Sequence, residues 1–249
     1  MKWGSFSPLH IATLFIAALI VIGLYFLLKN RSERTQRAVL GCLSVSGIAA
    51  IVFNLVRWGS PLEYLPLHLC SINAILLPIA VLTCSKILGN LMLVWCLGAL
   101  AALVVNSTMA GVDIFSDTFF FYYVPHVFEF GVPLLLFKLR LVEKDARCIG
   151  PTLGITMLIY SFVHLANKLV NWLCSEFEIA DGSGEIIEVN YMFSISPENP
   201  LLEEFYEILP MEYWYMYLAV PIVAVYLVIV YAPQLLSGHK GKHKKAMAG

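Results

Sequence analysis

Charged residues are scarce in this chain, and their scarcity decides its class. Only 13% of the 249 residues are charged, 59% are hydrophobic, and the mean hydropathy is +0.79. A soluble globular domain is typically about 45–50% apolar and roughly 25% charged. The composition therefore excludes an ordinary soluble domain and predicts an integral membrane protein, for which we expect membrane lipids and no nucleic acid as partners.

Paired cysteines and internal repeats are also missing. The six cysteines are scattered singly, without a CxxC pair, which argues against a disulfide framework and against a zinc ribbon. No internal repeat is visible, so the inverted-repeat architecture of many transporters is not indicated.

Seven apolar runs predict an all-α polytopic membrane protein, a single seven-helix domain over residues 1–249. Each run is close to the ~20 residues that a spanning helix requires. The third run is the shortest, because Pro66 and Pro78 bracket it. The predicted spans are 8–28, 37–56, 66–84, 87–107, 119–138, 149–173 and 213–235.

The charges of the segments that connect the spans predict the orientation of the protein in the membrane. With seven spans, Lys and Arg fall on one side, including the tail 236–249, whereas the other side carries the acidic segment 174–212 without any Lys or Arg. The positive-inside rule makes the basic side cytoplasmic. We therefore expect the N-terminus outside, the C-terminus in the cytoplasm, and a bacterial plasma membrane as the location.

Polar residues inside the predicted spans cluster at one depth. Ionisable groups at membrane depth are functional-site candidates by default. The outer halves of four spans carry them, while the inner halves are almost wholly apolar, which predicts one wet cavity near the outer leaflet. The residues are His68, Cys70, Asn73, Asn106, His126, Glu129, His164, Asn167 and Lys168.

Cys70 is the candidate nucleophile of this layer. A thiol reacts well when a neighbouring base takes its proton. His68, two residues away, would point to a different helix face, so His126 on another span is the better partner. Glu129, three residues after His126, could orient the imidazole. The competing interpretations are inert packing for Cys70 and a self-satisfied buried pair for His126 and Glu129.

A polar stripe on the sixth span has two interpretations. His164, Asn167, Lys168 and Asn171 share one helical face. The face lines either a cavity or a contact with another segment. Lys168 could meet a phosphate headgroup, or it could extend to the membrane interface.

A metal centre is the weaker hypothesis. His68, His126, His164 and Glu129 could together hold an ion with an open position. No HxxxH or HExxH pairing links these four, and each would come from a separate place. We therefore assign no metal and no cofactor.

Short motifs suggest a family. Residues 65–70, read as LPLHLC, resemble a signature of the YwaF-like integral membrane proteins, residues 121–126 resemble their aromatic-aromatic-x-x-His stretch, and Asn190-Tyr191-Met192 resembles their NYM motif. The three motifs occur in the same order in this chain as in that family, and they extend over most of the chain. An animal relative in that broader family is an ether-phospholipid acyltransferase with a cysteine and histidine pair. The resemblance thus implies that Cys70 and His126 are catalytic, and leaves Glu129, His164 and Lys168 uncovered.

Two functions follow from these observations. The leading hypothesis is a membrane acyltransferase that forms a thioester on Cys70, with His126 as base and phospholipid and lysophospholipid as substrates. The alternative is a seven-helix transporter or receptor-like binding protein that uses the same outer cavity without catalysis. Span count cannot decide between them, and neither the substrate nor the oligomeric state follows from the sequence.

Overall fold

The structure is a computed structural model that describes residues 2–4, 6–58, 60–105 and 109–246. Across these ranges the regular secondary structure is helical, apart from two isolated bridges, Lys2 with Asp113 and Ala180 with Ile186. The predicted all-α class is confirmed. Within the described chain, six helical segments are long and apolar enough to cross a membrane.

The helices follow one another with short connections until α7. The long helices are α1 (Pro8–Leu28), α5 (Lys86–Val104), α6 (Asp117–Lys138), α7 (Ile149–Glu176) and α9 (Val220–Ala246). The shorter ones are α2 (Glu33–Ser44), α3 (Ser46–Arg57), α4 (Leu69–Thr83) and α8 (Pro200–Ile208), with 3-10 turns η1 (Ala146–Cys148), η2 (Tyr191–Phe193) and η3 (Trp214–Ala219).

The third predicted span, 66–84, is shorter in the structure than the sequence suggested. Residues 60–68 form turns, and α4 begins only after His68, whose backbone is extended (φ −70°, ψ 150°). The helix ends at Cys84, which adopts a left-handed conformation (φ 49°). Its 15 residues rise about 22 Å, less than the ~30 Å of a hydrocarbon core. Six spans are therefore shown by length and composition, and α4 stands apart from them.

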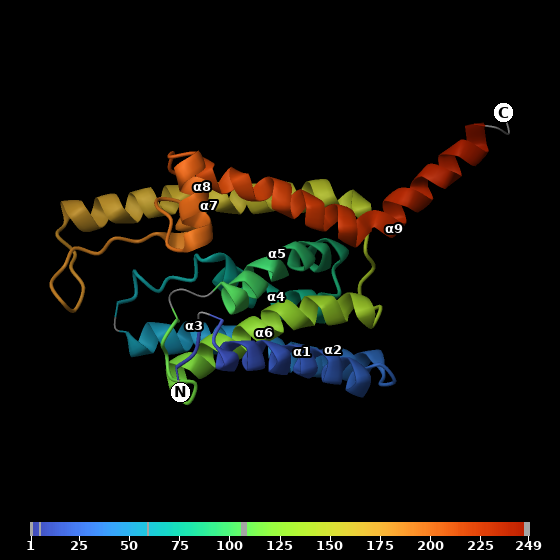
Figure 1. The fold of residues 1–249 in the computed structure, drawn as a ribbon, viewed down its shortest axis with the longest axis horizontal. Helices are drawn as coiled ribbons and strands as arrows, with labels where there is room; N and C mark the ends of the chain where they lie inside the picture. Colours follow the sequence, from blue (N-terminus) through green and yellow to red (C-terminus); the bar gives the residue numbers. More distant parts are fainter. Residues whose placement is uncertain (1, 5, 59, 106–108, 247–249) are drawn as a thin grey trace.

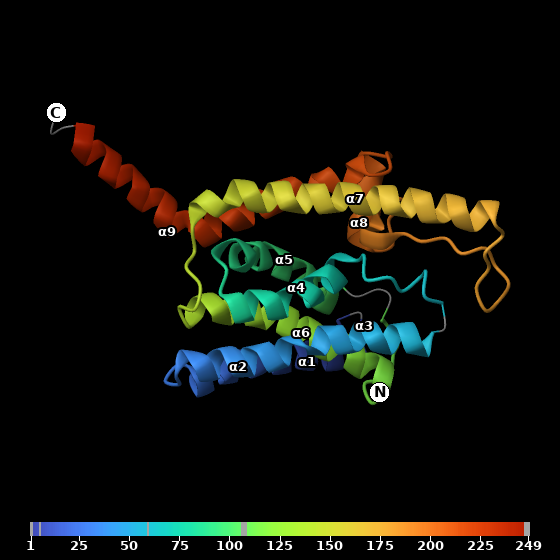
Figure 2. The ribbon, with the colours of Figure 1, turned by 180° about the vertical axis from the view of Figure 1, so that it is seen from behind.

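The helices form two outer layers around an inner pair. Figures 1 and 2 show α7, α8 and α9 on one side, α1, α2, α3 and α6 on the other, and α4 and α5 between them. The predicted second span, 37–56, lies within α2 and α3, which meet at Val45. This arrangement makes α4 and α5 the centre of the molecule.

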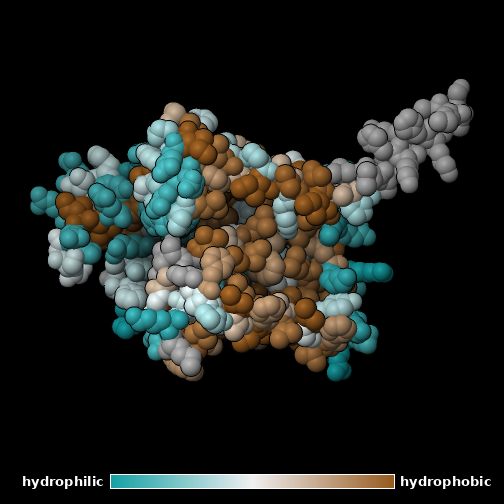
Figure 3. All heavy atoms as spheres, viewed as in Figure 1, coloured by the Kyte–Doolittle hydropathy of each residue, from teal (hydrophilic) through white to brown (hydrophobic). Residues whose placement is uncertain are grey.

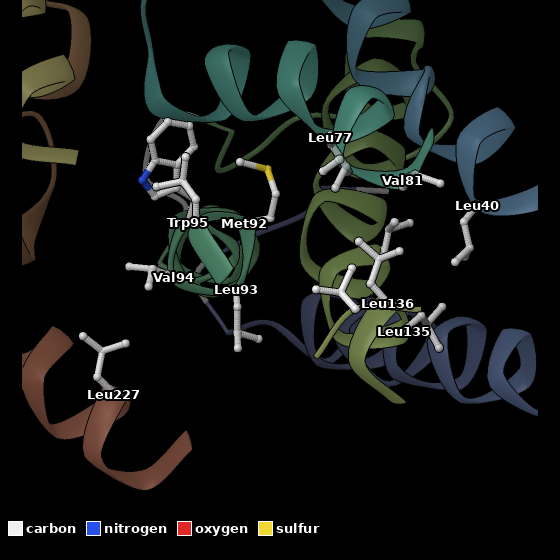
Figure 4. Packing of buried hydrophobic residues seen from close by; sticks show 14 of the residues in the cluster. Leu40, Leu77, Val81, Met92, Leu93, Val94, Trp95, Leu135, Leu136 and Leu227 are labelled. Atoms are coloured by element: carbon white, nitrogen blue, oxygen red, sulfur yellow. The ribbon is translucent and has the colours of Figure 1, made fainter. Parts of the chain in front are cut away.

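The hydrophobic core surrounds α5. Ten residues of this helix are buried, among them Met92 and Trp95. Leu77 from α4, Leu136 from α6 and Leu227 from α9 belong to the same cluster (Figure 4). The Trp95 indole N–H also donates to Thr156 Oγ1 of α7 at 2.9 Å. Burial of α5 on all sides explains why it is apolar all round.

The surface has an apolar belt between polar ends. Figure 3 shows brown side chains across the middle of the molecule and teal ones toward both ends. At one end Lys86 Nζ, at the start of α5, lies 2.6 Å from Asp145 Oδ2 in the connection before α7. At the other end the acidic segment after α7 folds back over the molecule (Figure 1). This distribution is that of a protein surrounded by lipid at mid-height.

Candidate functional site

Cys70 lies in the first turn of α4. Pro66 precedes the helix and cannot donate a backbone N–H, and the Ile72 N–H donates to the His68 carbonyl at 3.0 Å to close the first turn. Cys70 is half-buried and carries a free thiol. The thiol thus lies beside the N-terminal end of a helix, whose unpaired N–H groups favour negative charge.

His126 lies in the first half of α6, and a backbone carbonyl fixes its ring. The imidazole Nδ1 lies 2.6 Å from the carbonyl oxygen of Tyr122, and the two rings are 4.3 Å apart. Since a carbonyl oxygen can only accept, Nδ1 carries the proton and Nε2 keeps its lone pair. The histidine is therefore held in the tautomer that a general base needs.

Cys70, His126 and Glu129 come together from two helices. A donor atom of each residue lies within 4.8 Å of the other two. No other group of three or more His, Cys, Asp or Glu side chains meets this distance in the part of the chain that the structure describes. The site therefore brings a thiol, an imidazole and a carboxylate into one small volume.

Glu129 and Asn73 occupy the buried side of this group. Their exposed fractions are 4% and 1%. Among the described residues, Glu129 Oε2 and both amide atoms of Asn73 have no hydrogen-bond partner, although the two side chains lie close enough to interact. Gly47 of α3 closes over them, since a Cβ built there would lie 3.0 Å from Glu129 Oε1. The ring of His126 is thus oriented by Tyr122, and no hydrogen bond gives Glu129 the orienting role that the sequence suggested.

The polar stripe of α7 binds a backbone segment. Asn167 donates to the Tyr191 carbonyl at 2.8 Å and accepts from the Tyr191 N–H at 3.0 Å. One turn later Asn171 makes the same pair of bonds to Val189, at 3.0 and 2.7 Å. We call residues 187–196 the strap, because these two asparagines hold it against α7. The stripe is therefore a contact with another segment, one of the two interpretations that the sequence allowed.

The remaining predicted residues also contact the strap or its surroundings. His68 Nδ1 accepts from the Met192 N–H at 3.3 Å, and His164 Nδ1 lies 3.0 Å from Ser194 Oγ. Asn190 donates to Glu198 Oε1 at 2.7 Å within the acidic segment. Lys168 forms an ion pair with Glu212. Asn106 lies outside the described residues.

A second site, unforeseen from the sequence, lies beside the strap. A cavity of about 330 Å³ is lined by Ser161, His164, Leu165, Glu212, Tyr213 and Trp214. Tyr213 has a left-handed backbone (φ 64°), and its hydroxyl bonds Ser161 Oγ at 2.7 Å and the Tyr217 hydroxyl at 2.8 Å. The run of aromatic residues at 213–217 was the available signal, but it reads equally well as a membrane-interface belt.

Comparison with protein-family models identifies a match over most of the chain. The model of the TMEM164 family matches residues 5–231, which include Cys70, His126 and Glu129. No curated protein and no solved structure matches the sequence.

Proposed function

Because the chain belongs to the TMEM164 family of multi-pass membrane proteins, we propose that it is a membrane-embedded acyltransferase that works through a thioester on Cys70. The observation that carries the proposal is the approach of the Cys70, His126 and Glu129 donor atoms within 4.8 Å. A nucleophile and its base must lie near hydrogen-bond distance, and apo geometries are commonly looser than the reacting complex.

The reaction has two half-steps. His126 Nε2 takes the thiol proton of Cys70 while Sγ attacks the acyl carbonyl of a phospholipid. The lysophospholipid alkoxide leaves and receives that proton from the imidazolium. In the second half, the hydroxyl of an acceptor lysophospholipid gives its proton to Nε2 and attacks the thioester, which restores the thiol.

The sequence motifs support the same chemistry. Residues 65–70 and 121–126 resemble motifs of the YwaF-like family, and its relationship to an animal acyltransferase implies that Cys70 and His126 are the catalytic pair. The substrates would be phospholipid and lysophospholipid. No cofactor is required, since an acyl transfer between oxygen atoms through a thioester needs none.

The proposal includes a topology. We assign α4 as a short seventh crossing, entered through residues 60–68, because irregular backbone at membrane depth is tolerated when protein surrounds it. With seven crossings the N-terminus is outside and the basic tail is cytoplasmic. The site then opens toward the outer leaflet, in a bacterial plasma membrane.

The test is detection of the acyl-enzyme. Purified protein is incubated with a phospholipid whose acyl chain is isotopically labelled, and intact-mass and peptide spectra are recorded. We expect a hydroxylamine-sensitive adduct on Cys70 that Cys70→Ser abolishes. Cys84→Ser is the matched control, because Cys84 is also half-buried and caps the other end of α4. The absence of an adduct with every phospholipid class tested would overturn the proposal.

A second candidate function rests on the cavity beside the strap. The cavity of about 330 Å³ with Glu212 and Tyr213 in its wall could hold a small molecule without catalysis, as in a transporter or receptor. This candidate expects Cys70→Ala to keep ligand binding, whereas Glu212→Ala abolishes it. The acyltransferase expects Cys70→Ala to lose all turnover.

A further inference from the structure

The Glu129 carboxylate has no assigned partner in the acyl-transfer chemistry. Its Oε2 is buried and has no hydrogen bond within the described part of the chain, and the His126 ring is already oriented by the Tyr122 carbonyl. A buried ionised carboxylate is costly unless a proton, a cation or a hydrogen bond compensates it. The feature that needs explaining is therefore a buried carboxylate beside a thiol and an imidazole.

The three donors are the ligand types of a zinc site. Sulfur, imidazole nitrogen and carboxylate oxygen bind Zn²⁺ at about 2.0–2.3 Å, so tetrahedral ligand atoms lie roughly 3.3–3.8 Å apart. The donor atoms of Cys70, His126 and Glu129 all lie within 4.8 Å of one another. Side-chain rotations that move the Cys70 and Glu129 ligand atoms by about 1 Å bring the donor-atom distances into this range. Three protein ligands leave the fourth position open for water or a substrate atom.

The surroundings resemble an outer coordination sphere. A metal-binding histidine commonly donates its other ring N–H to a carbonyl or carboxylate, which fixes the ring. His126 does so through Nδ1 to Tyr122, which leaves Nε2 for a metal. Asn73, on the same helix as Cys70, has a buried amide without a hydrogen bond beside Glu129, where it can hold a coordinating carboxylate.

The charges also balance. We propose that Cys70, His126 and Glu129 form a site for a soft divalent cation of the Zn²⁺ class. A thiolate, a neutral imidazole and a carboxylate together carry two negative charges, so a divalent ion gives a neutral assembly inside the membrane region. On binding, the thiol proton of Cys70 and any proton on the Glu129 carboxyl pass to the medium, and Sγ and a carboxylate oxygen become ligands.

Metal binding has a consequence for the reaction. A coordinated Sγ cannot attack an acyl carbonyl, so the ion inhibits acyl transfer until it dissociates. This consequence rests on the proposed acyltransferase function, whereas the binding itself does not. Zinc binding and the acyltransferase function can therefore be tested separately, and either one can fail without the other.

The test measures Zn²⁺ alone on the full chain in detergent. The tail contains His239 and His243, which can bind zinc by themselves, so the parent for this experiment carries His239→Ala and His243→Ala. Equilibrium dialysis should give about one tightly bound Zn²⁺ per chain. Cys70→Ser, His126→Ala and Glu129→Gln should each remove it, and Asn73→Ala should weaken it by about 10–100-fold.

A labelling experiment locates the ion without relying on activity. Zn²⁺ should protect Cys70 from N-ethylmaleimide, while Cys42, which is exposed, is labelled at the same rate with and without the metal. Size-exclusion profiles identify any variant that fails to fold. Glu129→Asp keeps a carboxylate and should bind Zn²⁺, whereas Glu129→Gln should not. Unchanged zinc stoichiometry in Cys70→Ser, or unprotected labelling of Cys70, would overturn the proposal, whatever the acyl-adduct assay gives.

Discussion

The carbonyl oxygen of Tyr122 lies 2.6 Å from Nδ1 of His126, one helical turn further along α6. This single contact determines which ring nitrogen can act as a base, because the carbonyl cannot donate a proton. Nε2 is the nitrogen left for the thiol of Cys70. In the proposed mechanism the helix backbone takes the orienting role that an acidic residue has in a serine-protease triad.

The first prediction concerns this base. His126→Asn keeps a side-chain amide that can donate to the Tyr122 carbonyl, but it has no group that can accept the thiol proton. We expect acylation of Cys70 to slow by about 10²–10⁴-fold, the usual contribution of a general base. Time-resolved intact-mass spectra with a labelled phospholipid measure the rate. If the Asn variant acylates as fast as the parent, the histidine acts only as a structural anchor.

The second prediction concerns the close approach of α3 and α4. A Cβ on Gly47 would lie 2.5 Å from the Cβ of Ala74 and 3.0 Å from Glu129 Oε1. Gly47→Ala therefore forces the helices apart, and we expect a loss of about 1–3 kcal/mol in stability, with a lower thermal midpoint. Gly154→Ala in α7 is the matched control, since no atom lies within 4 Å of its Cβ. The control should be neutral or stabilise by up to ~1 kcal/mol.

The third prediction concerns the strap. Asn167→Ala leaves the buried N–H and carbonyl of Tyr191 without their partner. We expect a loss of about 1–3 kcal/mol and faster hydrogen exchange and proteolysis across residues 187–196.

Lys168 provides the control for the strap. It lies next to Asn167 in the sequence, but its ion pair with Glu212 is exposed, with side-chain accessibilities of 50% and 44%. Exposed pairs contribute about 0–1 kcal/mol, so Lys168→Ala should leave the exchange rates of the strap almost unchanged. Equal effects of the two substitutions would contradict the role assigned to Asn167.

The sequence predicted the all-α class and the pairing of Cys70 with His126. The class follows from the length of the apolar runs. The pairing follows from the depth of each residue along its span, because residues at the same depth on neighbouring helices can lie close together. Cys70 and His126 could be matched because each lies in the first half of its predicted span, and the seven-span prediction starts both spans from the same side.

The sequence could not predict how polar side chains are satisfied. The depth of the polar residues predicts that Asn167 and His164 share a wet cavity with Cys70. In the structure they bond to residues 190–194, which carry no sequence signal for that contact. The start of α4 at Leu69 likewise follows from the packing of residues 60–68 against the strap, where Leu62, Leu65 and Leu67 join one hydrophobic cluster. Such contacts depend on tertiary structure, which local patterns do not encode.

The last prediction concerns Asp145, outside the membrane-spanning segments. Arg147 Nη2 lies 3.0 Å from its Oδ2 and Lys86 Nζ lies 2.6 Å from the same atom, and hydrogen bonds from Arg147 and then from Lys86 hold the pKa of this carboxyl well below its usual range. A carboxyl whose pKa is lower in the folded state stabilises the protein above its unfolded value of about 3.9, and this contribution is lost as the pH falls toward the folded pKa. Asp145→Asn removes the contribution at neutral pH, so the thermal midpoints of the variant and the parent should differ at pH 7 and begin to converge as the pH falls below about 4. Glu143→Gln, an exposed acid two residues away, serves as the control and should not reproduce the convergence. If the difference in thermal midpoint between Asp145→Asn and the parent stays constant from pH 7 to pH 3, the charge of Asp145 does not contribute. The carboxyl then acts as a neutral cap for η1 and not as an ion-pair partner that links α5 to the start of α7.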